Sequence, residues 1–347
     1  ARTMTTNSIG RAIYSVLSIS GAIICLIIVL SLIRRLYWGQ SSANESKKVM
    51  QPTVRMKICS ISCGIVLCIG FIMKSLIISS VIDKETAESN VVLVLNNLGN
   101  LLMDCGQALY FKYFILSIRK LYRTNDVARH AISKPVMYFT ETLIIFNIGI
   151  SIVYTLCILA VFHSTKINQD TLQTIAIIYT ISNLSFNLLI DICLIYLYKS
   201  IISNYALNWS FNASALSKDE HHLLLLMMVR YCSLIIISAS IDVITEIYTT
   251  FEIFIGNDYL YKGKETWTII AGAFELIDVT TYVIVIFFSF SINNLIYERY
   301  CWCCHNAVYG SAHKLIAKKH GSDGYIMMRD QSMDNNGDNI TMMRDNR

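Results

Sequence analysis

The chain has 347 residues, of which 54% are hydrophobic and only 15% are charged, and its formal net charge is +5. Soluble domains are roughly 45–50% apolar and about 25% charged, so this composition excludes an ordinary soluble protein. The apolar residues are gathered into seven runs, each long enough to supply the roughly 20 helical residues that cross a hydrocarbon core. We therefore predict an all-α integral membrane protein that folds as a seven-helix bundle.

The predicted membrane helices occupy most of the chain. In order they are Ala12–Ile33, Ile58–Ile82, Val91–Ile118, Met137–Phe162, Leu172–Tyr198, Leu223–Tyr248 and Trp267–Ile292. Barrel strands would alternate apolar and polar residues over about ten positions, whereas these runs are apolar at odd and even positions alike, which favours helices. We assign residues 1–300 to the bundle, 301–320 to a juxtamembrane cysteine cluster with a short amphipathic segment, and 321–347 to a disordered tail.

The charges of the loops predict the orientation of the bundle. The first and third loops are rich in Lys and Arg, whereas the second, fourth and sixth are acidic or nearly neutral. Because basic loops are normally cytoplasmic, we expect the N-terminus outside the cell and the C-terminus in the cytosol. We expect the lipids around the bundle to be those of the plasma membrane, with another endomembrane as the alternative. The N-x-S/T triplets at Asn208 and Asn212 fall on the predicted cytoplasmic side, and glycans there would indicate the opposite orientation.

Ionisable and amide side chains recur inside the predicted helices. Such residues are costly in a membrane and usually face the bundle interior, so each is a candidate for ligand binding. The candidates are Lys74, Asn100, Asp104, Asn187, Asp191, Asp242, Glu246, Glu275 and Asp278. Most are acidic and would attract a cationic ligand, with Lys74 neutralising one carboxylate or meeting an anionic group. The alternative is that they form only interhelical hydrogen bonds and one buried ion pair.

Two further charged residues lie near the inner ends of the predicted helices. Arg230 is about two turns into the sixth helix, and we expect its side chain to snorkel to the inner membrane surface as an anchor. Glu141 lies at the inner end of the fourth helix, and we assign it no role.

Three of the eleven cysteines form a cluster just after the seventh helix. Cys301, Cys303 and Cys304 lie beside Trp302 near the predicted inner headgroups, which favours reversible S-palmitoylation. Unmodified thiols are the main alternative, and a zinc site is disfavoured because no second ligand pair follows at the usual spacing. The other eight cysteines lie within the predicted helices, where we interpret them as packing residues, and we expect no extracellular disulfide.

The whole plan resembles that of G-protein-coupled receptors: seven helices, basic inner loops, a membrane-proximal cysteine cluster and a polar tail. The closest local match is Asn293-Asn294-Leu295-Ile296-Tyr297, which is similar to the N-P-x-x-Y ending of the seventh helix in rhodopsin-like receptors, with Asn294 replacing proline. The resemblance implies that Asn293 and Tyr297 help to switch the cytoplasmic end. The chain lacks the acidic-Arg-Tyr triplet of the third helix, the C-W-x-P motif of the sixth, the acidic residue of the second and the disulfide.

A second stretch, from Ile277 to Tyr282, resembles the seventh helix of microbial rhodopsins, in which an Asp precedes the retinal-binding Lys by one turn. Here Tyr282 occupies the position of that Lys, which excludes a retinal Schiff base in this helix. The sequence also has no phosphate-binding glycine loop, metal-ligand cluster or nucleophile–base pair. We therefore expect neither a catalytic activity, nor a cofactor, nor a metal.

These observations together favour a divergent receptor of the sensory or chemoreceptor type. We expect an extracellular small-molecule ligand to shift the population between two packings of the bundle. Arg119, Lys120, Arg123 and Arg129 would contact a cytosolic transducer such as a G protein, or simply anionic lipid. The alternatives are a proton- or cation-coupled transporter or channel and a structural protein that forms homo-oligomers. We expect no nucleic-acid partner.

Overall fold

The computed structural model describes residues 2–38, 52–80, 90–163, 169–207, 218–255, 264–289, 301–312 and 314. Within these ranges the protein is all-α, as the sequence predicts. The helices are α1 (Arg2–Trp38), α2 (Val54–Ser80), α3 (Asn90–Thr124), the short α4 (Asp126–Ala131), α5 (Lys134–His163), α6 (Gln169–Leu207), α7 (Lys218–Ile255) and α8 (Lys264–Ser289). Residues 302–312 form a further helical stretch. Each predicted apolar run corresponds to one of the seven long helices.

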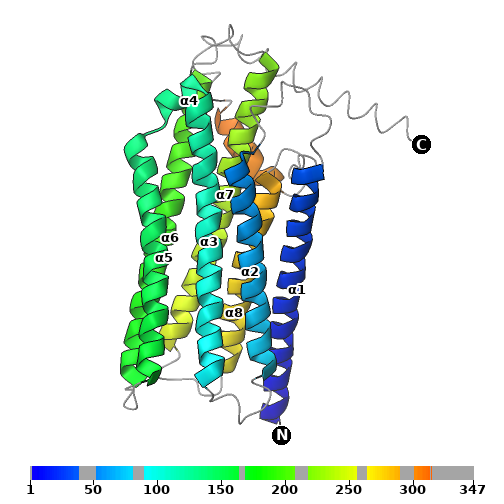
Figure 1. The fold of residues 1–347 in the computed structure, drawn as a ribbon, viewed down its shortest axis with the longest axis vertical. Coiled ribbons are helices and arrows are strands. Elements are labelled where there is room, and N and C mark those ends of the chain that lie inside the picture. The colour runs from blue at the N-terminus through cyan, green and yellow to red at the C-terminus, as the bar shows by residue number, and fades with distance from the viewer. Residues whose placement is uncertain are drawn as a thin grey trace, which may run out of the picture.

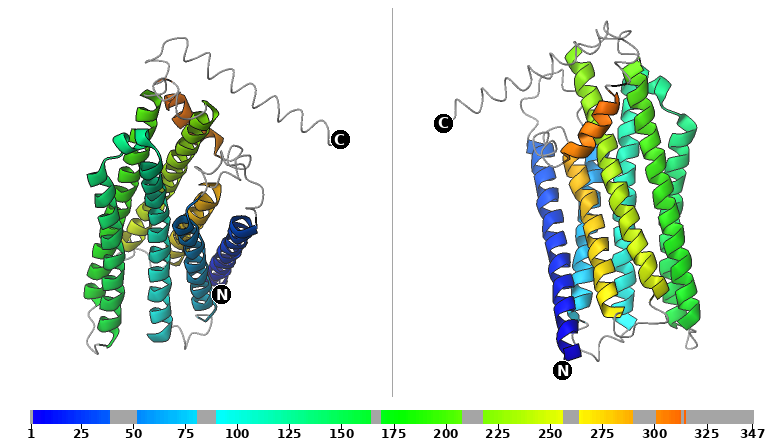
Figure 2. Two further views of the ribbon diagram at one scale, coloured as in Figure 1. Left: turned by 45° about the horizontal axis from the view of Figure 1, so that its top comes forward. Right: turned by 180° about the vertical axis from the view of Figure 1, so that it is seen from behind.

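The long helices lie side by side along the long axis of the molecule (Figure 1). Helices α1, α2 and α3 pack in sequence, as do α5, α6, α7 and α8, and contacts between α1 and α8 close the bundle. Helix α3 also packs against α5, α6 and α8, which gives it a central place. The 302–312 stretch lies at the end of the bundle opposite the N-terminus, beside α7 and α8 (Figure 2).

Five of the described helices are long and apolar enough to cross a membrane. Their apolar windows are Ser15–Arg34 in α1, Val54–Lys74 in α2, Lys134–Ala160 in α5, Thr174–Tyr205 in α6 and Leu224–Thr249 in α7. In α8 the apolar window is shorter, at Leu276–Ser289. Helix α3 is not among the five, and it carries Asn97, Asn100, Asp104 and Gln107 along one face. We conclude that the chain is a multi-pass membrane protein.

The distribution of side chains supports this conclusion. The exposed surface is apolar at many positions, including Ile27 of α1, Ile145 of α5 and Ile178 of α6, which are 57%, 70% and 60% exposed. Polar side chains such as Asn187 and Asp191 are instead buried. Water would favour the opposite arrangement, since exposed apolar patches of this extent mark contact with a membrane or a partner.

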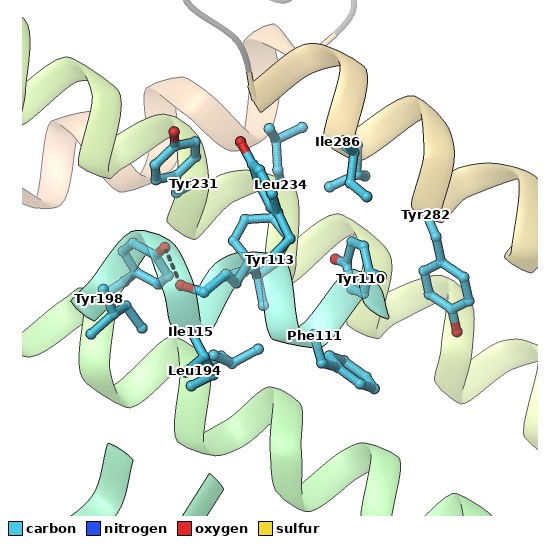
Figure 3. Close-up of a cluster of buried hydrophobic side chains, with 14 of the residues drawn as sticks. Tyr110, Phe111, Tyr113, Ile115, Leu194, Tyr198, Tyr231, Leu234, Tyr282 and Ile286 are labelled. Carbon is cyan, nitrogen blue, oxygen red and sulfur yellow. Dashed lines mark hydrogen bonds between the residues drawn. The ribbon is translucent and has the colours of Figure 1, made fainter. Parts of the chain in front are cut away.

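The core contains a group of aromatic side chains from α3, α6, α7 and α8 (Figure 3). The rings of Tyr110 and Phe114 meet edge to face at 5.1 Å, and Phe114 meets Tyr198 and Tyr231 in the same way at 6.2 Å and 5.9 Å. The ring centroids of Tyr110 and Tyr282 are 4.7 Å apart. Edge-to-face pairs are favoured by the ring quadrupole, so this group fixes how α3 is seated among its neighbours.

Close packing of α2 on α3 depends on glycine. A Cβ atom added at Gly106 would overlap the side chain of Leu67, which is fully buried. The Cys63 thiol donates to the Gly106 carbonyl at 3.2 Å across the same contact. The absence of a side chain at Gly106 therefore lets the two helices approach, as small residues do in membrane bundles.

Candidate functional site

Three aspartates meet inside the bundle. Asp191 of α6, Asp242 of α7 and Asp278 of α8 are 1%, 4% and 8% exposed. The carboxyl of Asp242 lies beside those of Asp191 and Asp278, and we call these three residues the aspartate cluster. The sequence places them on separate helices, and the tertiary structure brings them together.

The hydroxyl of Tyr282 connects the aspartate cluster to α3. It donates to Asp242 Oδ1 at 2.5 Å and lies 3.1 Å from Asp278 Oδ2. The side-chain amide of Gln107 donates to the same hydroxyl oxygen at 2.6 Å. Tyr282 follows Asp278 by four residues, about one helical turn, so the two side chains share a face of α8. Tyr282 is not among the candidate binding residues predicted from the sequence. Its four-residue spacing from Asp278 is the signal that could have identified it.

Amide side chains extend the connection to α5 and α6. Asn187 Nδ2 of α6 donates to Gln107 Oε1 at 3.3 Å and lies at the same distance from Asn183 Oδ1. Asn147 Nδ2 of α5 donates to Asn187 Oδ1 at 2.8 Å. The hydrogen bonds therefore run from α5 through α6, α3 and α8 to α7. We call the residues Asn147, Asn187, Gln107, Tyr282 and the aspartate cluster together the polar network.

A second group of polar side chains surrounds two stacked tyrosines. The rings of Tyr154 and Tyr179 are 4.0 Å apart and nearly parallel, and the Tyr179 hydroxyl donates to Asp104 Oδ2 at 2.5 Å. The charges of Asp104 and Lys74 both act on Tyr154. Lys74 is 7% exposed and packs over Gly99 of α3. This arrangement combines an acid, a base and two aromatic rings around α3.

The remaining candidate binding residues lie beside these two groups or outside the described side chains. Glu246 of α7 is half-buried, and its charge acts on Asp278 and on Tyr179. Asn100 of α3 is half-buried, and its Oδ1 has no hydrogen-bond partner within the described part of the protein. Glu275 lies in α8, but its side chain is outside the described ones.

The basic residues at the other end of α3 differ in their surroundings. Arg119 pairs with Glu141 of α5, which Lys112 also contacts at 2.9 Å, and Arg119 lies over the ring of Tyr138. Glu141 therefore joins α3 to α5, although we assigned it no role from the sequence. Lysine and arginine seek a counter-charge in a membrane, and a carboxylate on the neighbouring helix supplies it.

The other predicted contacts for a transducer or lipid lie further along the chain. Lys120 is half-buried, and burial lowers its pKa. Arg123 and Arg129 are exposed, and Arg129 is 3.0 Å from Asp126 within α4. Asn125 caps α4 by accepting from the Ala128 amide and donating to the Tyr205 hydroxyl of α6. This cap holds the connection between α3 and α5 against α6.

The three cysteines of the predicted acylation site are not equivalent. Cys303 is exposed, Cys304 is half-buried, and Cys301 is buried, which raises the pKa of the Cys301 thiol to about 11. All eleven cysteines are free thiols. The Ser233 hydroxyl of α7 lies 3.4 Å from the Cys304 carbonyl, so this stretch is attached to the bundle.

Arg230 does not snorkel as the sequence suggested. Its side chain is 6% exposed, and its charge acts on Cys301 and on His305. The 302–312 stretch contacts α7 nearby, where the Ser233 hydroxyl meets the Cys304 carbonyl. Burial and then the charge of Arg230 lower the pKa of His305. The predicted switch residues Asn293 and Tyr297, and the predicted tail 321–347, lie outside the described residues.

Within the described ranges, no group of three or more His, Cys, Asp or Glu side chains is arranged to hold a metal ion. No protein-family model, curated protein or solved structure matches this chain.

Proposed function

We propose that the chain is a seven-helix membrane receptor, with its N-terminus outside the cell and its C-terminus in the cytosol, that senses a small cationic ligand. The proposal counts α3 and α8 as membrane-spanning helices, and for α3 this is supported by polar side chains that face the bundle interior. On α3, Asn97 and Gln107 are 5% and 7% exposed, whereas Val94 and Leu98 are 38% and 41% exposed. A helix with polar residues turned inward can cross a membrane at a lower mean hydropathy.

The observation that carries the proposal is the polar network itself. Its hydrogen bonds join α5, α6, α3, α8 and α7 in one connected set. A ligand that changes one member alters the balance of contacts among five helices. Receptors require this kind of coupling, in which a ligand favours one of two packings by its differential affinity for them.

The charges of the network indicate the class of ligand. Asp191, Asp242 and Asp278 meet beside Glu246, and a second acid, Asp104, lies against the tyrosine pair. A small organic cation, such as an amine, matches this excess of carboxyl groups. On the opposite side of the membrane, the exposed Arg123 and Arg129 would meet a transducer or anionic headgroups.

The test is a ligand screen in intact cells. Cells expressing the full chain with a C-terminal energy-transfer reporter are exposed to a library of small amines, and recruitment of G-protein subunits is recorded. We expect at least one amine to give a response that Asp278→Asn abolishes and Asp126→Asn leaves intact, because Asp126 is exposed on α4, far from the polar network. A response that survives Asp278→Asn, or the absence of any response to amines, contradicts the proposal.

Orientation is tested separately by a protease added to intact cells. A C-terminal tag should remain protected, and glycans at Asn208 or Asn212 should be absent. Cleavage of the tag would show that the C-terminus lies outside the cell, which would contradict both the proposed orientation and the receptor proposal.

A second candidate function is proton- or cation-coupled transport. The specific observation in its favour is that the carboxyl, phenol and amide groups of the network form an unbroken hydrogen-bonded series across five helices. Proteoliposomes containing the full chain and a pH-sensitive dye distinguish the two candidates. Ligand-independent proton flux that Asp278→Asn removes would favour transport over reception.

A further inference from the structure

The aspartate cluster brings acceptor atoms against acceptor atoms. The carboxyl of Asp242 contacts those of Asp191 and Asp278. If all three groups are ionised, neither oxygen of Asp191 has a donor, and Asp242 Oδ2 and Asp278 Oδ1 have none either, among the described side chains. Facing carboxyl groups satisfy one another only when a proton lies between them, as in pairs of acidic residues that share one proton.

The arrangement indicates where the protons are held. Asp242 lies between the other two aspartates, and its Oδ1 already accepts from Tyr282 at 2.5 Å. Asp242 is therefore placed as the common acceptor. A proton on Asp191 and a second on Asp278 would each be donated to Asp242, which leaves one negative charge shared among three carboxyl groups.

A neutral group beside the cluster points to the same conclusion. The Tyr110 hydroxyl is fully buried beside the hydroxyl of Ser238, and neither has another hydrogen-bond partner among the described side chains. Asp191, Asp242 and Asp278 all lie close enough to Tyr110 to interact with it electrostatically. A single buried carboxylate can be stabilised by hydrogen bonds from hydroxyl groups of this kind. Three ionised carboxylates would instead require several positive counter-charges.

The groups packed around the cluster do not supply those counter-charges. Helix α3 contributes Gln107 and the phenol of Tyr110, α7 contributes Ser238 and Glu246, and α8 contributes the phenol of Tyr282. On α6 the facing ionisable group is Asp191 itself. Lys74 acts instead on Tyr154, in the group around Asp104. Among the described side chains, these groups that face the cluster are neutral or acidic.

We propose that Asp191, Asp242 and Asp278 form a proton-binding site that holds two protons at neutral pH and couples their release to separation of α6, α7 and α8. When the helices separate and water enters, each released proton passes from a carboxyl oxygen to water and leaves a carboxylate behind. The proton is thus a ligand of the bundle in its own right. The binding of two protons does not depend on the receptor proposal. Only the coupling of their release to helix movement rests on it.

Infrared spectroscopy of the purified full chain in lipid nanodiscs tests proton occupancy directly. A protonated carboxyl has a carbonyl stretching band that a carboxylate lacks. At neutral pH we expect this band in the wild type. Its intensity should fall by about half in Asp191→Asn, and the remaining half should be lost in the double variant with Asp278→Asn. The matched control is Asp126→Asn on exposed α4, which should leave the band unchanged. The absence of the band in the wild type at neutral pH overturns the proposal.

The pH dependence of stability is an independent readout that needs neither a ligand nor a transducer. Unfolded aspartates ionise near pH 3.9, so above that value the folded protein holds two protons that the unfolded chain does not. Its folding constant should then fall about 100-fold per pH unit, ten-fold for each proton, until the protons leave the folded state. Asp191→Asn keeps the donor to Asp242 and should reduce this slope to about ten-fold. An unchanged slope in a folded variant contradicts the proposal, even if an amine agonist has been found.

Discussion

Replacing Tyr282 with Phe removes the hydroxyl that connects α3, α7 and α8. The change deletes the contacts to Asp242 Oδ1 at 2.5 Å and Asp278 Oδ2 at 3.1 Å and the hydrogen bond from Gln107 at 2.6 Å. The aromatic ring remains and keeps its contact with Tyr110, whose centroid is 4.7 Å away. The variant therefore isolates the hydrogen bonds from the packing.

The expected loss of stability follows from the number of bonds. Interhelical hydrogen bonds in membrane proteins average about 0.6 kcal/mol each, so the two that join Tyr282 to Asp242 and Gln107 amount to about 1 kcal/mol. Tyr282 is 1% exposed, which prevents water from replacing the lost partner of the Gln107 amide. Leaving a buried donor unsatisfied costs about 1–3 kcal/mol, which agrees with this figure.

The assay is unfolding of the purified chain in mixed micelles by a denaturing detergent, followed by circular dichroism. The matched control is Tyr196→Phe, since Tyr196 lies on α6 with 53% of its surface exposed. The double variant with Gln107→Leu should cost less than the sum of the single changes, because it removes both partners of one bond. Equal stability of Tyr282→Phe and the Tyr196→Phe control would refute the assigned role of Tyr282.

Two further substitutions and one labelling experiment test other parts of the structure. Glu141→Gln removes the carboxylate that pairs with Arg119 and Lys112, whose side chains are 30% and 41% exposed, and it should reduce the free energy of unfolding by at most about 1 kcal/mol, measured in the same assay. Gly106→Ala places a Cβ against Leu67 and should cost about 1–3 kcal/mol by overpacking α2 on α3. The Cys301 thiol, with a pKa of about 11, should be about one-thousandth thiolate at pH 8 and react slowly with a maleimide, as mass spectrometry of the labelled peptide would report.

Each of these predictions has a matched control in the chain. Asp126→Asn breaks an exposed pair with Arg129 and should have no measurable effect. Gly149→Ala meets nothing within 4 Å and should be neutral or stabilising, because Ala favours helix more than Gly does. Cys303 is exposed and should be labelled well before Cys301. If the controls behave like the test variants, the assigned contacts are wrong.

Several features of the fold followed from the sequence because each depends on one helix at a time. The length and apolar character of the runs predict the long helices, and the runs Ala12–Ile33 and Met137–Phe162 fall within α1 and α5. The helices extend beyond the runs, since hydrogen bonding along the backbone continues where the side chains become polar. Amide and acidic residues at three- and four-residue spacing predict an inward face on α3, and Asn97 and Gln107 are buried there.

Contacts between helices required the tertiary structure. Glu141 and Arg119 are 22 residues apart, and only the packing of α5 on α3 makes them partners. Arg230 is buried, and the 302–312 stretch contacts α7 at Ser233, which no property of α7 alone predicts. Tyr282 lies 175 residues from Gln107, and its role depends on α3 meeting α8.

By itself, the sequence determined that the chain is helical and multi-pass, because the hydrophobic effect and backbone hydrogen bonding in a membrane act on each segment separately. The tertiary structure alone decided which polar groups meet. Burial of a carboxyl is favourable only with a partner, and the partners of Asp242 come from α6 and α8. Their positions depend on how the helices rotate and pack, as Gly106 and the aromatic core around Phe114 direct.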